Sequence, residues 1–79
     1  MEERLGIAGS GEIACGLAAL AAPCGEVLLW ARSDRSAARA RDAVRASAGE
    51  DAAVRIETDP AVLEKASFVV EAIVEDHDV

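Results

Sequence analysis

The stretch that decides the fold is Gly9-Ser10-Gly11-Glu12-Ile13-Ala14. It follows the apolar run Leu5-Gly6-Ile7-Ala8 and opens a segment whose apolar residues have helical spacing. A strand, a glycine turn and a helix in this order hold the pyrophosphate of a dinucleotide. Gly9 allows a sharp turn, Gly11 lets the backbone approach phosphate, and Ala14 lets the helix pack close to the strand. We therefore predict a dinucleotide-binding turn whose helix start offers free N–H groups to the phosphates.

The rest of the chain alternates strand-like and helix-like segments. Strands are expected at 4–8, 26–31, 54–58 and 67–74, and helices at 11–22, 33–49 and 59–66. The runs 26–31 and 67–74 have the continuous apolar character of buried parallel strands, whereas 54–58 alternates and suits a position nearer the sheet edge. Connections between parallel strands are right-handed, so the order predicts an α/β fold, the first half of a Rossmann-like doubly wound parallel sheet.

Helical spacing also predicts which side chains face the sheet. The inner face of the first helix is expected to contain Ile13, Gly16, Leu17, Leu20 and Ala21. In the second helix the inner positions are Ala37, Ala40 and Val44, and the positions facing water are Arg39, Arg41, Asp42 and Arg45. Ser33, Asp34 or Ser36 is expected to cap the second helix, and the pair Asp59-Pro60 to start the third.

Length and composition limit what the chain does alone. Its 79 residues predict one partial dinucleotide-binding domain, 1–79, with no second domain and a thin core containing one Trp, one Phe and no Tyr. The net charge of −7 argues against nucleic-acid binding. No apolar run is long enough to cross a bilayer, and the start Met1-Glu2-Glu3 lacks the basic region of a signal peptide, so we expect a cytoplasmic protein.

Cysteine and histidine offer little material for catalysis or metal binding. Cys15 and Cys24 are expected to be buried free thiols, because no second cysteine pair or histidine stands at ligand spacing. His77 is the only histidine and is expected to be solvated. The sequence therefore predicts no metal site and no catalytic residue within this chain.

The end of the second strand bears on the choice between NAD and NADP. In the NAD form of this site a carboxylate about 20 residues after the glycines binds the adenosine ribose, and here Ala31 holds that place. Arg32 and Ser33 follow and are suited to the 2′-phosphate of NADP, so NADP is favoured; the alternative is that Arg32 is a solvated loop arginine. Glu12 would repel a pyrophosphate unless its side chain points away.

The other end of the chain resembles a known family. Phe68-Val69-Val70-Glu71-Ala72-Ile73-Val74-Glu75-Asp76 resembles the fourth-strand signature of 3-hydroxyacyl-CoA dehydrogenases. Arg55-Ile56-Glu57-Thr58-Asp59, leading into Leu63, is similar to that family's third-strand region. With the glycine turn and Gly16, the resemblance spans Leu5 to Val79. It implies an enzyme that oxidises the 3-hydroxyl of an acyl-CoA by hydride transfer to a nicotinamide cofactor.

Carried over by residue, the resemblance implies that Gly9 to Ala14 line the pyrophosphate and that Ala72 and Glu75 lie near the nicotinamide-side ribose. Glu75 also fits the rule that ligands bind at the carboxyl ends of strands; the alternative for Glu75 is an ordinary solvated strand end. The family's catalytic histidine and glutamate belong to a part of the fold after the fourth strand. We therefore expect the acyl-CoA substrate to bind only in a longer protein.

Three departures from the family leave other identities open. Ala31 replaces its acidic residue, Ala14 stands where glycine is usual, and the segment between the second and third strands is short. Leu29-Trp30-Ala31-Arg32 is similar to the second-strand end of glycerol-3-phosphate dehydrogenases, and the glycine turn is shared with phosphogluconate dehydrogenases. Further alternatives are a nucleotide- or partner-binding module that forms a homo-oligomer through an exposed sheet edge, and a fragment with no function of its own.

Overall fold

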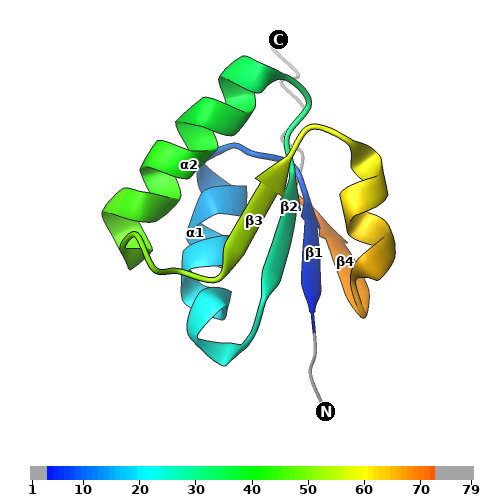
Figure 1. Cartoon of the computed structure of the whole chain (residues 1–79), viewed down its shortest axis with the longest axis horizontal. Coiled ribbons are helices and arrows are strands. Elements are labelled where there is room, and N and C mark those ends of the chain that lie inside the picture. Colours follow the sequence, from blue (N-terminus) through cyan, green and yellow to red (C-terminus); the bar gives the residue numbers. More distant parts are fainter. Residues whose placement is uncertain (1–3, 73–79) are drawn as a thin grey trace, which may run out of the picture.

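The computed structural model describes residues 4–72 and contains a four-stranded parallel sheet (Figure 1). The strand order is β3-β2-β1-β4, with β1 at Leu5–Ala8, β2 at Val27–Trp30, β3 at Val54–Glu57 and β4 at Phe68–Glu71. The helices are α1 (Glu12–Ala21) and α2 (Asp34–Ala48), with the short 3-10 helices η1 (Ala22–Cys24) and η2 (Pro60–Lys65). This arrangement confirms the predicted α/β fold, half of a Rossmann-like sheet.

The helices lie on both faces of this sheet. Figure 1 shows α1 and α2 together on one face and η2 on the other. The chain moves outward from β1 to β2 and β3, and then returns through η2 to place β4 on the opposite side of β1. The order therefore reverses at β1, which makes the carboxyl end of β1 the point where an open parallel sheet binds ligands.

The core lies between the sheet and the two long helices. Ile7 of β1 and Leu29 of β2 are register partners and are fully buried. Above them pack small residues, among them Ala14 and Ala18 of α1 and Ala40 of α2. Alanine side chains let both helices approach the sheet closely. The buried residues of α2 are Ala37, Ala40 and Val44, which confirms its predicted inner face.

Local capping follows the sequence closely. Ser33 is the N-cap of α2, and its hydroxyl oxygen accepts a hydrogen bond from the Ser36 backbone N–H at 3.1 Å. Asp59 caps η2 by accepting from the Ala61 N–H at 3.0 Å, with Pro60 in the first turn. The third predicted helix therefore begins as expected, and it forms a 3-10 helix.

Two predictions about buried residues on and after α1 were wrong. The buried residues of α1 are Ala14, Cys15 and Ala18, whereas Ile13 and Leu20 are largely exposed. Because α1 packs against α2 as well as against the sheet, its buried stripe is turned toward α2 and is centred on small residues. Cys15 is buried as expected, but Cys24 is exposed. It lies in the short helix η1, which has no buried residue.

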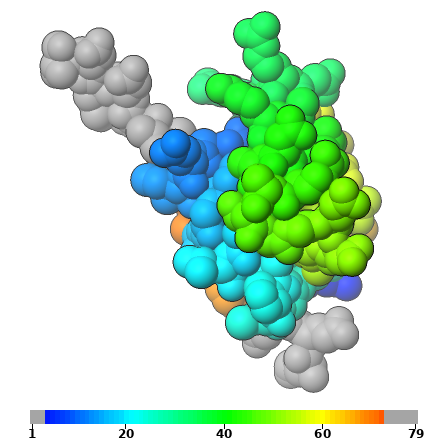
Figure 2. All heavy atoms as spheres, turned by 90° about the vertical axis from the view of Figure 1, so that its left-hand side faces the viewer, coloured from blue at the N-terminus to red at the C-terminus, as the bar shows by residue number. Residues whose placement is uncertain are grey.

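The fourth strand also differs from its expected burial. All four residues of β4 are exposed, although their composition predicted a buried strand. β4 pairs with β1 alone within residues 4–72, and Figure 2 shows it at the margin of the face formed by α1 and α2. The predicted strand residues 73 and 74 lie outside the described part. β3 is the opposite edge strand, as its alternating pattern indicated.

Among the helices between residues 4 and 72, none is both long enough and apolar enough to cross a membrane.

Candidate dinucleotide-binding site

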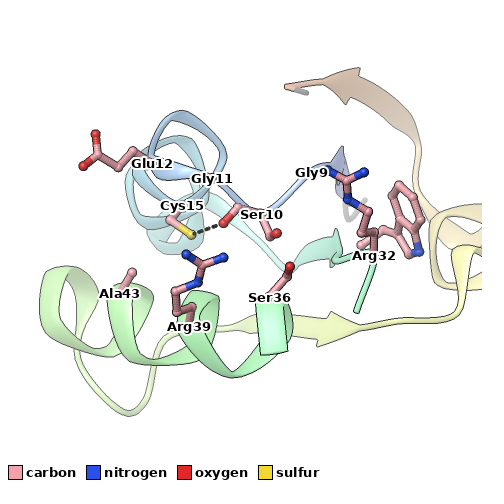
Figure 3. A pocket seen from close by; sticks show the side chains of 10 residues that line it. Gly9, Ser10, Gly11, Glu12, Cys15, Arg32, Ser36, Arg39 and Ala43 are labelled. Atoms are coloured by element: carbon pink, nitrogen blue, oxygen red, sulfur yellow. Dashed lines mark hydrogen bonds between the residues drawn. The ribbon is translucent and has the colours of Figure 1, made fainter. Parts of the chain in front are cut away.

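A cavity of about 540 Å³ lies at the carboxyl ends of β1 and β2, between the amino-terminal parts of α1 and α2 (Figure 3). The residues that line it come from the glycine turn, α1, the end of β2 and α2: Gly9, Ser10, Gly11, Glu12, Cys15, Trp30, Arg32, Ser36, Arg39 and Ala43. This is the position at which the reversal of strand order is expected to place a ligand.

The glycine turn follows directly from the end of β1. Gly9 has a φ of 142°, a conformation that side-chain-bearing residues rarely adopt, and its N–H donates to the Trp30 carbonyl at 2.9 Å. Gly11 has an ordinary φ of −77° and is the N-cap of α1. A Cβ placed on Gly11 would meet no atom within 4 Å, so glycine here leaves open space beside the helix start. Gly9 thus serves the turn, whereas Gly11 keeps the cavity accessible.

The start of α1 presents backbone donors to this space. Gly11 has no side chain with which to cap the helix, so N–H groups in the first turn remain available to a ligand. Glu12 borders the cavity, but Figure 3 shows its carboxylate extended away from the glycine turn and from Arg39. The helix start therefore faces the cavity without a carboxylate pointing into it.

Positive charge gathers on the other walls. The ion pairs within residues 4–72 join Arg4 to Glu26, Arg45 to Asp42 and Arg55 to Glu57. Neither Arg32 nor Arg39 takes part in them, although acidic residues outnumber basic ones by 15 to 8 in the chain. Two guanidinium groups without carboxylate partners in this part of an acidic protein make the cavity suited to an anion.

An aromatic side chain forms a further wall. Trp30, the last residue of β2, is half-buried, and its indole Nε1 donates to the Thr58 carbonyl at 2.9 Å. This hydrogen bond holds the ring, which offers a flat apolar surface to the cavity that Arg32 also lines. Trp30 is the single tryptophan of the chain, so its fluorescence reports on this cavity.

The structure brings together only part of the predicted site. Gly9, Ser10, Gly11, Glu12 and Arg32 line the cavity. The other predicted residues that the structure describes do not: Ile13 is exposed on α1, Ala14 and Ala31 are buried, Ser33 caps α2, and Ala72 lies after β4. The Ala72 N–H donates to the Ala8 carbonyl at 3.1 Å, which fixes it beside the end of β1. Glu75 falls outside the described residues.

Sequence reasoning missed five lining residues: Cys15, Trp30, Ser36, Arg39 and Ala43. Arg39 was expected to face water, and it is exposed, but it also extends over the cavity. Ser36, Arg39 and Ala43 share one face of α2, next to the buried face, because they are three and four positions apart. The sequence shows that spacing, but it does not show which side of α2 faces the glycine turn.

The Cys15 thiol has a structural role in the cavity wall. Its Sγ donates to the Ser10 carbonyl at 3.4 Å, and burial raises the pKa of the thiol above its ordinary value of 9.0. The thiol is therefore protonated at neutral pH and supports the glycine turn. Within residues 4–72 no group of three or more His, Cys, Asp or Glu side chains could hold a metal ion.

Comparisons of this chain with protein-family models, with curated proteins and with solved structures gave no match. The assignment of function therefore depends on the fold, the cavity and its charges. These features belong to one connected edge of the sheet, formed by the ends of β1 and β2.

Proposed function

We propose that this chain is the dinucleotide-binding part of an NAD(P)-dependent oxidoreductase. The observation that carries the proposal is the cavity between the glycine turn and two arginines without carboxylate partners among residues 4–72, at the edge where the strand order reverses. Open parallel sheets bind nucleotides at such a reversal. A cavity of about 540 Å³ lies within the range of small-molecule and cofactor sites.

The pyrophosphate is assigned to the N–H groups that follow Gly9 and Gly11, where the dipole of α1 favours negative charge. The adenosine ribose is assigned to the end of β2, near Trp30 and Arg32. Ala31 supplies no carboxylate to the ribose hydroxyls, because its side chain is a buried methyl group. This arrangement favours NADP over NAD.

The bound nicotinamide would supply a hydride acceptor or donor. The resemblance of residues 68–76 to 3-hydroxyacyl-CoA dehydrogenases supports a 3-hydroxyacyl-CoA as the substrate of the whole enzyme. Glycerol-3-phosphate and phosphogluconate dehydrogenase-like enzymes are the alternative, supported by the shared glycine turn and, for the first group, by Leu29-Trp30-Ala31-Arg32. We assign no acid or base to residues 4–72, where the histidine that such a reaction uses is not present.

The direct test is a Gly11→Val variant. A Cβ at Gly11 meets no atom within 4 Å and its φ of −77° suits any residue, so the variant is expected to fold. The added isopropyl group would occupy the space assigned to the pyrophosphate and weaken binding at least about 10-fold, the equivalent of about 1.4 kcal/mol. Titration of NADH and NADPH against Trp30 fluorescence measures this, and circular dichroism verifies the fold.

Gly16→Val is the matched control. Gly16 lies on the same helix, also with no atom within 4 Å of an added Cβ, and does not line the cavity. Its variant is expected to bind both dinucleotides as the parent chain does. The proposal is overturned if the parent chain binds neither dinucleotide, or if Gly11→Val binds them unchanged.

The edge strand supports a second candidate function, association with another copy of the chain. Phe68, Val69 and Val70 are exposed, and β4 has one unpaired edge within the described residues. Exposed apolar edge strands pair readily with other strands. This second candidate predicts a dimer in sedimentation equilibrium, which Val69→Lys converts to monomer. A parent chain that stays monomeric at every concentration removes this candidate.

A further inference from the structure

The α2 wall of the cavity has a chemistry that the glycine turn does not explain. Ser36 and Arg39 lie one helical turn apart on α2 and border the cavity opposite the glycine turn. Figure 3 shows the Arg39 side chain extending from α2 toward the segment that carries Ser10, with Ser36 between Arg39 and Arg32. The N–H groups at the start of α1 can hold a pyrophosphate without these side chains, so Ser36 and Arg39 are available to a second anionic group.

We infer that Ser36 and Arg39, together with Arg32, bind a separate phosphate monoester of the ligand, so that Arg39 determines specificity for a 2′-phosphorylated adenosine. This inference rests on the proposed dinucleotide function and deepens it. A guanidinium group matches phosphate oxygens with two parallel hydrogen bonds, which a ribose hydroxyl cannot offer. Two arginines that line the same cavity, with Ser36 between them in Figure 3, therefore favour a dianionic group.

The helix itself leaves Arg39 available for such a ligand. The side chains one turn away from it are Arg35, Ser36, Asp42 and Ala43. Asp42 is the only carboxylate among them, and its Oδ1 lies 3.7 Å from a guanidinium nitrogen of Arg45. Arg35 adds a like charge four residues before Arg39, which is unfavourable in an isolated helix. A bound phosphate would compensate this concentration of positive charge.

Ser36 has a proton available for the same group. The Ser33 hydroxyl donates to the Ser36 Oγ at 3.0 Å and also accepts from the Ser36 N–H. Because Ser36 Oγ is the acceptor in that contact, its own O–H is free to donate. We therefore assign to Ser36 the phosphate contact that the sequence predicted for Ser33, because the Ser33 hydroxyl caps α2.

The test compares ligands that differ by one phosphate on the full chain. NADPH, NADH, 2′,5′-ADP and 5′-AMP are titrated against Trp30 fluorescence for the parent chain and for Arg39→Ala. We expect the parent to bind NADPH and 2′,5′-ADP more tightly than their partners. Arg39→Ala should weaken both about 10-fold or more, as expected for a lost charged hydrogen bond, and change NADH less than about 2-fold.

Two further variants separate a specific contact from general charge. Arg35→Ala removes the same charge from the exposed first turn of α2 without touching the cavity, and is expected to change NADPH binding less than about 2-fold. Arg39→Lys should restore part of the loss. Equal binding of NADH and NADPH, unchanged by Arg39→Ala, overturns this inference and leaves the proposed function standing. Absence of binding by any dinucleotide overturns both.

Discussion

Two strands of the same sheet, β2 and β4, have similar compositions and opposite environments. Both begin with three apolar residues, in Val27-Leu28-Leu29-Trp30 and in Phe68-Val69-Val70-Glu71. The first three side chains of β2 are at most 1% exposed, whereas Phe68, Val69 and Val70 are 54%, 47% and 39% exposed. Their apolar content therefore made both segments strands without deciding how deeply either is buried.

The difference comes from the neighbours of each strand. β2 is hydrogen-bonded to β1 on one side and to β3 on the other, and it contacts both α1 and η2. β4 has β1 as its only strand partner within residues 4–72. Because β2 is paired on both sides, its first three side chains are buried and the candidate cavity lies at its carboxyl end, a strand of the core supports the proposed site. β4 is the part open to association.

The largest effect is expected from truncating equivalent positions in these two strands. Leu29 and Val70 both pair with Ile7, one on each side of β1. Leu29→Ala should lower the free energy of unfolding by about 2–5 kcal/mol, because it leaves a cavity in a fully buried position. Val70→Ala should cost less than about 1 kcal/mol, because its side chain is already partly in water. Urea unfolding measures both.

Equal losses in the two variants would contradict this comparison. They would mean that β4 is covered in solution, and sedimentation of the Val70→Ala variant would then identify whether a second copy covers it.

An intermediate effect is expected at Gly6, where β1 meets the connection to β4. A Cβ on Gly6 would lie 2.8 Å from the Ala66 Cβ and 3.1 Å from the Val69 Cγ2. Gly6→Ala should therefore destabilise the fold by about 1–3 kcal/mol, because the Ala66 backbone must move. Gly16→Ala is the control, since its space is open, and should be neutral or stabilise α1 by up to about 1 kcal/mol. Thermal unfolding that ranks the two variants in the reverse order would refute this contact.

The smallest effect concerns the buried and exposed thiols at alkaline pH. Burial raises the pKa of Cys15 above 9.0 in the folded chain, so the unfolded chain releases that proton first. The buried, protonated thiol of Cys15 therefore stabilises the folded state. This contribution to the free energy of unfolding is complete below pH 9.0 and is lost as the pH rises through the pKa of the folded state. Cys15→Ala should abolish this part of the pH dependence, whereas Cys24→Ser should keep it. Urea unfolding at pH 8 and at about pH 10 compares them; an identical slope in all three chains would exclude the linkage.

Much of the fold was predictable because its signals are local. The apolar runs, the Asp59 cap and the glycine turn each act within a few residues, and the strands, the cap and the turn that they predict are present in the structure. Of the three candidates for the cap of α2, Ser33, Asp34 and Ser36, the structure selects Ser33. The errors arose where one element meets another. Ile13 and Leu20 have helical spacing with the inner residues, but the contact between α1 and α2 turned the buried stripe toward Ala14 and Ala18.

Some features of the candidate site likewise follow from local sequence, and others depend on contacts between elements. The sequence by itself determined the turn at Gly9, the open position at Gly11 and the α/β alternation, because these depend on backbone conformation and local patterning. Only the tertiary structure decided that Trp30, Ser36 and Arg39 face the same cavity and that Ala31 and Ser33 do not. Their placement depends on the rotation of α2 against α1 and on the end of β2. Helix rotation is set by packing between segments distant in the chain, which no local pattern specifies.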